Sequence, residues 1–168
     1  DSSPLQRISA EINVKDKFQN TKSLGPILNR EPSKKIRLGY YSSDFRNHAM
    51  SYLLAGLFEL HDKSKFELIA FYFGPEKKDE MTERIASTFD KFIETNSKTD
   101  KEIAQLSRDL KIDIAIDLMG FTKSNRFGIF MERCAPIQIN YLGYPGTSGS
   151  NCIDYIIADK ILIPKENQ

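Results

Sequence analysis

A histidine and a group of small polar residues stand between a strand-like segment and an apolar-striped segment. Residues 35–43 are nearly continuous in apolar character, and apolar side chains then recur at helical spacing. The end of the first segment and the residues after it contain Ser42, Ser43, Asp44, Arg46, Asn47 and His48. The positive end of a helix dipole favours a neutral imidazole, which accepts a proton or donates one hydrogen bond. His48 is therefore a candidate base or substrate ligand, and an ordinary residue of a helix start is the alternative.

Two later strand-like segments end in the same kind of residues. Residues 112–120 contain Asp117 near their end and lead into a polar turn, and residues 136–143 lead into the glycine-rich stretch 143–149. The carboxyl ends of parallel strands meet at one edge of a sheet, where ligands bind. We therefore expect the three loops to face one cleft.

Each of these loops also has a plainer interpretation. Ser43 or Asp44 is a typical helix cap, and Asp44 is able to cap and to bind substrate. Asp117 is either a functional carboxylate at a strand end or a structural partner for a neighbouring amide. The stretch 144–149 is either only a tight turn or a turn whose small residues let backbone amides approach a phosphate or sugar.

The elements that position these loops follow a strand–helix alternation. Strands are expected at residues 35–43, 66–74, 90–94, 112–120, 136–143 and 153–159. Helices are expected over residues 4–18, over the apolar stripe from Met50 to His61, and at 79–89, 100–110 and 124–132. Such alternation predicts a Rossmann-like, doubly wound α/β fold with a mainly parallel sheet.

Composition excludes several classes of partner. The chain has 168 residues with a formal net charge of +1, so it lacks the basic field typical of proteins that bind nucleic acid or an anionic membrane. No apolar run reaches the length of about 20 residues that spans a bilayer, and the polar start does not resemble a signal peptide. These features predict a cytoplasmic protein, unless a removed segment preceded Asp1.

Known catalytic and metal-binding motifs are missing from the sequence. Cys134 and Cys152 have no metal-ligand spacing, so they are expected to be ordinary buried thiols, and no metal site is predicted. No GxGxxG follows the first strand and no GxxxxGK[ST] is present, which argues against dinucleotide and P-loop nucleotide sites. No G-x-S-x-G elbow points to a serine nucleophile.

Four separated blocks resemble one enzyme family. They are "RLGYYSSDFRNHAMSYLLAGLFELHDKSKFELIAFYF", "IDIAIDLMGFT", "RCAPIQINYLGYPGTSG" and "IDYIIAD". Their order and content are similar to the N-terminal catalytic lobe of the protein O-GlcNAc transferase and SPINDLY-like enzymes of glycosyltransferase family 41. The resemblance covers about residues 35–164.

The resemblance implies an architecture and a set of partners. It implies the first of two Rossmann-like lobes of a GT-B glycosyltransferase, with residues 34–168 as this lobe and the second lobe absent from the sequence. Residues 1–33 would be a helical joint and tether that follows tetratricopeptide repeats. A nucleotide-sugar would be the donor and a protein the acceptor, with no cofactor and no metal.

The resemblance also assigns site residues. It implies that His48 is a base or a ligand of the sugar and phosphate, and it places Asp117 with it as catalytic. The expected substrate-binding residues are Asp44, Asn47, Gly120, Thr122, Gly143, Tyr144, Pro145, Gly146 and Thr147. Met119 and Phe121 depart from the residues frequent in the family, which bears on donor or acceptor choice.

The expected reaction is transfer of GlcNAc from UDP-GlcNAc to Ser or Thr of proteins, with inversion. Transfer of fucose to oxygen or of glucose to Asn is the alternative within the family, and a non-catalytic α/β binding module is the alternative outside it. The sequence stops soon after the last expected strand, which is typical of a fragment. Such a fragment is expected to be inactive and to bind nucleotide-sugar weakly.

Overall fold

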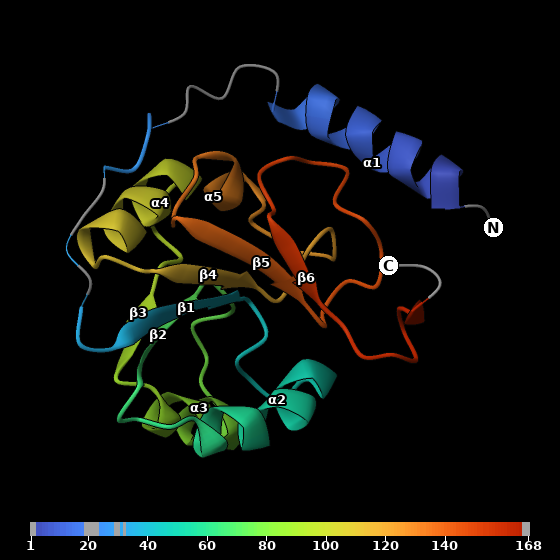
Figure 1. Ribbon diagram of the computed structural model, residues 1–168. Coiled ribbons are helices and arrows are strands. Elements are labelled where there is room, and N and C mark those ends of the chain that lie inside the picture. The colour runs from blue at the N-terminus through green and yellow to red at the C-terminus, as the bar shows by residue number, and fades with distance from the viewer. Residues whose placement is uncertain (1–2, 19–23, 29–30, 32, 166–168) are drawn as a thin grey trace.

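The computed structural model describes residues 3–18, 24–28, 31 and 33–165. In this part of the chain a six-stranded sheet has the strand order β3-β2-β1-β4-β5-β6, and all its pairings are parallel (Figure 1). The strands are β1 (Ile36–Ser42), β2 (Phe66–Tyr72), β3 (Lys91–Glu94), β4 (Ile114–Asp117), β5 (Ile137–Tyr141) and β6 (Tyr155–Ile157). The helices are α1 (Ser3–Phe18), α2 (Ala49–Leu60), α3 (Glu80–Thr88), α4 (Asp100–Asp109) and α5 (Gly128–Met131).

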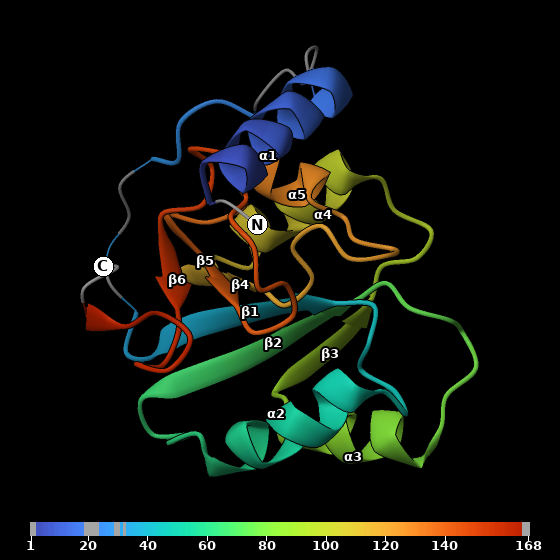
Figure 2. The same ribbon diagram turned by 90° about the vertical axis from the view of Figure 1, so that its right-hand side faces the viewer.

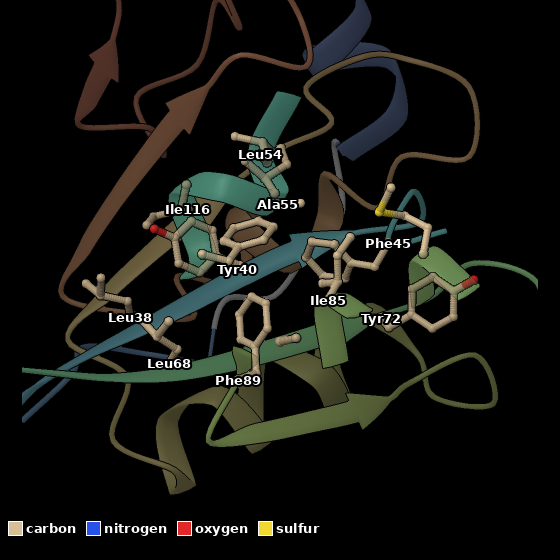
Figure 3. Packing of buried hydrophobic residues seen from close by; sticks show 14 residues of the cluster. Leu38, Tyr40, Phe45, Leu54, Ala55, Leu68, Tyr72, Ile85, Phe89 and Ile116 are labelled. Carbon is tan, nitrogen blue, oxygen red and sulfur yellow. The ribbon is translucent and has the colours of Figure 1, made fainter. Parts of the chain in front are cut away.

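Helices cover both faces of the sheet. α2 and α3 lie on one face, and α1, α4 and α5 lie on the other (Figure 2). On the α2/α3 face, Tyr40 meets Phe89 edge to face with ring centroids 5.8 Å apart (Figure 3). On the opposite face, Tyr41 stacks on Phe71 at 4.4 Å. Because both faces of β1 are packed in this way, its sequence is nearly continuous in apolar residues.

The order of the strands creates a crevice. β1 pairs with β2 on one side and with β4 on the other. The chain builds the sheet outward from β1 to β3, then returns and builds outward from β4 to β6. Strand order therefore reverses between β1 and β4. In open parallel sheets this is where the carboxyl ends of the strands leave room for a ligand.

The predicted Rossmann-like, doubly wound fold is confirmed, and local signals explain its helix starts. α3 begins with a capping box in which Asp79 and Thr82 bond each other's backbone N–H groups. α4 begins with the same arrangement of Thr99 and Glu102. Each pair satisfies amide groups that a helix start leaves without partners.

Several elements are shorter than the sequence predicts. The strand expected at 112–120 ends at Asp117, because the side chain of Asp117 accepts hydrogen bonds from backbone N–H groups of the next turn. The helix expected at 124–132 is only the single turn α5. The strand expected at 136–143 ends at Tyr141, followed by Leu142 with a φ of 64°.

The segment before the sheet is described in part. α1 packs on the sheet domain through Phe18, whose ring lies 6.1 Å from that of Phe127. Parts of the expected tether, residues 19–23, 29–30 and 32, lie outside the described residues. The boundary between residues 33 and 34 stays a prediction.

Candidate functional site

A cavity of about 590 Å³ opens at the crevice between β1 and β4. Four loops line it. The loop after β1 contributes Asp44 and His48, the loop after β2 contributes Gly74, the loop after β4 contributes Thr122, and the loop after β5 contributes Gly143. We call this cavity the cleft. The structure thus brings together the ends of all three loops that the sequence singled out.

His48 caps the helix that follows it. Its backbone is extended, and its Nδ1 accepts a hydrogen bond of 3.3 Å from the backbone N–H of Met50. A ring nitrogen that accepts a hydrogen bond carries no proton, so a neutral ring in this position has its proton on Nε2. The side chain is 37% exposed and lines the cleft. This geometry favours His48 as a hydrogen-bond donor over His48 as a base.

Asp44 lies between two cationic or ionisable side chains. Its Oδ1 accepts a hydrogen bond of 3.3 Å from Nη2 of Arg46, and its Oδ2 lies 3.7 Å from Nδ1 of His48. The Asp44 side chain is only 12% exposed. The helix cap that the sequence offered to Ser43 or Asp44 is made by His48 instead, because α2 begins only at Ala49.

Asn47 ties the loop to a neighbouring helix. Its backbone N–H donates to Oδ2 of Asp79 at 2.7 Å, and its side-chain oxygen accepts from the hydroxyl of Tyr52 at 3.1 Å. Asn47 is exposed, and it is not among the residues that line the cleft. Its visible contacts position the loop after β1.

Asp117 is buried behind the cleft wall. Its carboxylate accepts hydrogen bonds from the backbone N–H of Met119 at 2.9 Å and of Gly120 at 3.1 Å, and Nδ2 of Asn140 lies 3.4 Å away. Burial raises the pKa of Asp117 to about 6, although these hydrogen bonds act in the opposite direction. Asp117 does not line the cleft; it holds the turn whose next residues do.

The loops after β4 and β5 pack backbone against backbone. A β-carbon on Gly143 would lie 1.7 Å from the carbonyl oxygen of Leu118. Gly120 has a φ of 53°, and a β-carbon there would lie 2.4 Å from Cβ of Tyr144. Thr122 is fixed by a hydrogen bond from its hydroxyl to the carbonyl of Met119 at 2.8 Å. Glycine is required at both positions because no side chain fits.

The glycine-rich loop faces two ways. Gly143 lines the cleft, whereas Tyr144, Pro145 and Gly146 line a second cavity of about 770 Å³ beside α1. Thr147 lines a third cavity, of about 490 Å³, next to β6. The structure therefore groups Asp44, His48, Thr122 and Gly143, and separates the rest of this loop from them.

Sequence reasoning overlooked part of the cleft. Arg46 and Lys123 line it but were not among the expected site residues, and neither was the turn formed by Phe73, Gly74 and Pro75. A signal for the turn was present, because a Gly-Pro pair follows the apolar run of β2 at the same edge of the sheet. Arg46 was noted in the loop after the first strand, but the two cations were assigned no role because charged residues of a loop are usually solvated.

The described residues contain no group of three or more His, Cys, Asp or Glu side chains that would hold a metal ion. Within the same ranges, no helix is both long enough and apolar enough to cross a membrane.

Comparison with known proteins identifies the family. The sequence model of Glycosyl transferase family 41 matches residues 5–168. The chain belongs to glycosyl transferase family 41.

Two relatives of this family 41 chain are both named as UDP-N-acetylglucosamine--peptide N-acetylglucosaminyltransferases. It is 35% identical over 139 residues to the probable UDP-N-acetylglucosamine--peptide N-acetylglucosaminyltransferase SEC of Arabidopsis thaliana, covering 83% of this chain and 14% of that protein. It is 35% identical over 136 residues to the UDP-N-acetylglucosamine--peptide N-acetylglucosaminyltransferase of Caenorhabditis elegans, covering 78% of this chain and 12% of that protein. The chain thus spans only a small part of these relatives.

A solved structure is similar over almost the whole family 41 chain. It is a mutant of the Thermobaculum terrenum O-GlcNAc transferase, with a TM-score of 0.88 and 27% sequence identity. The match covers 99% of this chain and 32% of that one.

The family 41 cleft depends on the absence of a side chain at Gly143. Replacing Gly143 by Ala forces the loops after β4 and β5 apart, and we expect the free energy of unfolding to fall by about 1–3 kcal/mol. Urea denaturation measures this change. The control is Gly56→Ala in α2, where a β-carbon meets no atom within 4 Å. That variant should be unchanged or more stable by up to about 1 kcal/mol. Equal effects at the two glycines would contradict the packing argument.

The raised pKa of Asp117 makes stability depend on pH. Because its pKa in the folded chain lies above the value of about 4 for an exposed aspartate, the protonated folded form is favoured. The resulting stabilisation is complete below about pH 4 and is lost as pH rises through 6. Relative to Asp117→Asn, the wild-type free energy of unfolding should fall by about 2 kcal/mol between pH 4 and pH 7. Denaturant titrations at several pH values measure this difference; a difference that does not vary with pH would refute it.

Proposed function

We propose that this chain is the N-terminal catalytic lobe of an inverting protein glycosyltransferase that transfers GlcNAc from UDP-GlcNAc to Ser or Thr hydroxyls. The observation that carries the proposal is the position of His48, which lines a cleft at the reversal of strand order in a family 41 fold. The names of the relatives support the donor and the acceptor class.

In the proposed reaction, the acceptor oxygen forms a bond to the anomeric carbon, and its proton passes to an oxygen of the departing diphosphate, directly or through water. The bond from that carbon to the diphosphate breaks, and the diphosphate leaves with the electron pair. Hydrogen-bond donors aimed at the oxygens where charge develops accelerate such a step. We assign this role to the Nε2–H of His48, because its Nδ1 is occupied by the N–H of Met50.

The rest of the enzyme belongs to the same proposal. A second Rossmann-like lobe would complete a GT-B architecture and hold most of the nucleotide, and tetratricopeptide repeats before α1 would select acceptors. Family resemblance supports both, and it also supports a reaction that needs no cofactor or metal besides the UDP-sugar. Cys134 and Cys152 are free thiols, which supports a reducing compartment such as the cytoplasm.

The donor is tested by mass spectrometry. We expect the full-length protein, incubated with a Ser/Thr peptide, to add one N-acetylhexosamine from UDP-GlcNAc. GDP-fucose and UDP-glucose serve as competing donors in parallel reactions. Addition of fucose or glucose alone would replace the GlcNAc proposal by one of its alternatives in the family, and no transfer from any donor would favour a non-catalytic binding module.

His48 is tested with two substitutions in the full-length protein. His48→Ala removes the donor and should lower kcat/KM by about 10–100-fold, as expected for a hydrogen bond to a charged group. His48→Asn keeps a helix cap and an N–H donor but takes up no proton, so it should stay within about threefold of wild type, which is under 1 kcal/mol in barrier height.

Sugar transfer to a Ser/Thr peptide is the measurement, and thermal unfolding confirms that both variants fold. If His48→Asn is as inactive as His48→Ala, the assignment of His48 as a donor is contradicted and its role as a base is favoured. If His48→Ala loses less than about threefold, His48 has no part in the mechanism.

A further inference from the structure

Arg46 is the cation that the loop after β1 places in the cleft. It lines the cleft together with Asp44 and His48, and its side chain is 35% exposed. The only polar contact that its guanidinium makes with the described residues is the bond of 3.3 Å from Nη2 to Asp44. Its Nε is buried and has no hydrogen-bond partner within the described ranges. A guanidinium carries five N–H donors, so most of its capacity is unused.

Two other arginines show what a structural arginine looks like in this fold. Arg108 donates from all three nitrogens to backbone carbonyls, those of Leu24, Gly25, Glu132 and Arg133. Arg133 donates to both carboxylate oxygens of Asp154 and to two backbone carbonyls. Each of these guanidinium groups therefore makes four hydrogen bonds within the protein. Arg46 differs from them because it lines a cavity and makes only one hydrogen bond to the described residues.

The charges around the cleft favour an anion. Lys123 also lines the cleft, but it comes from the loop after β4, whereas Arg46 comes from the loop after β1. Among the carboxylates of the described residues, Asp44 alone lines the cleft with these two cations. Asp44 therefore orients Arg46 while leaving an excess of positive charge. An arginine fork is the side chain that best matches the paired oxygens of a phosphate or carboxylate.

We propose that Arg46 binds the diphosphate group of the nucleotide-sugar donor. This inference rests on the proposed function and adds a residue of the first lobe to donor recognition. A diphosphate is favoured over a carboxylate of the acceptor because it carries more than one negative charge, which matches two cations around one cleft at the reversal of strand order. Asp44 is the positioning residue, since it fixes the guanidinium and lies beside His48.

The test compares two ligands that differ only in the diphosphate. In the full-length protein, Arg46→Gln removes the charge but keeps the aliphatic stem as far as Cδ and an amide N–H donor. Its affinity for UDP, measured by calorimetry, should fall by at least about tenfold, the loss expected for a charge-assisted hydrogen bond. Its affinity for uridine should change by less than about twofold. Arg46→Ala should show the same selective loss.

The control is Arg84→Ala, which removes an exposed guanidinium paired with Glu59 on α2, away from the cleft. It should bind UDP and uridine like wild type. Thermal unfolding of all three variants shows whether they fold alike.

Three outcomes would overturn the inference. The first is an affinity of Arg46→Gln for UDP within twofold of wild type. The second is an equal loss for UDP and uridine. The third is unchanged UDP affinity with loss of a preference for peptides that carry Asp or Glu beside the acceptor Ser, which would assign Arg46 to the acceptor. Transfer of GlcNAc by the wild-type protein is scored separately, so the proposed function stands or falls independently of Arg46.

Discussion

The backbone contact between the loops after β4 and β5 is the constraint on which the cleft depends. The two loops leave neighbouring parallel strands, and there is no room for a side chain between Gly143 and the carbonyl of Leu118. The buried carboxylate of Asp117 fixes the turn by accepting hydrogen bonds from the backbone N–H groups of Met119 and Gly120. The wall that carries Thr122 is therefore set by packing and by a buried carboxylate, and it does not rely on the stiffness of the loops themselves.

The opposite wall is held by a chain of polar contacts. Ser42 accepts a hydrogen bond from the backbone N–H of Asp44, Asp44 bonds Arg46, and His48 caps α2. The cap has a chemical consequence, because it occupies one ring nitrogen of His48 and leaves the other for a ligand. The same bond that starts the helix thus fixes which ring nitrogen of a neutral His48 carries the proton.

The glycine-rich loop serves two surfaces of the family 41 fold. Its first residue, Gly143, borders the cleft, and the residues after it border cavities beside α1 and β6. The ring of Tyr144 lies 5.6 Å from that of Phe121, so aromatic packing joins this loop to the one after β4 on the α1 side. A sequence motif that looks like one binding element is therefore divided between the cleft and the space under α1.

The amino-acid sequence by itself determined the elements and the fold class. Helical stripes such as the one in α2, the apolar run of β1 and the turn residues at strand ends are local signals, and local spacing is enough to predict a parallel α/β sheet. The same rule predicted that loops at strand ends would meet, because parallel strands share the edge at which they end. Resemblance to a known family supplied the expected roles of individual residues.

Only the tertiary structure decided which polar residues share a cavity. Asp117 and His48 were equal candidates as sequence, yet one is sealed behind the turn that it bonds and the other opens into the cleft. Arg46 became a candidate only because its Nε lacks a hydrogen-bond partner within the described residues, and Tyr144, one residue after Gly143, lines the cavity beside α1 instead of the cleft. Burial, unused hydrogen-bonding capacity and the direction of a loop depend on contacts between segments far apart in the chain. The spacing of residues along the sequence does not reveal these contacts.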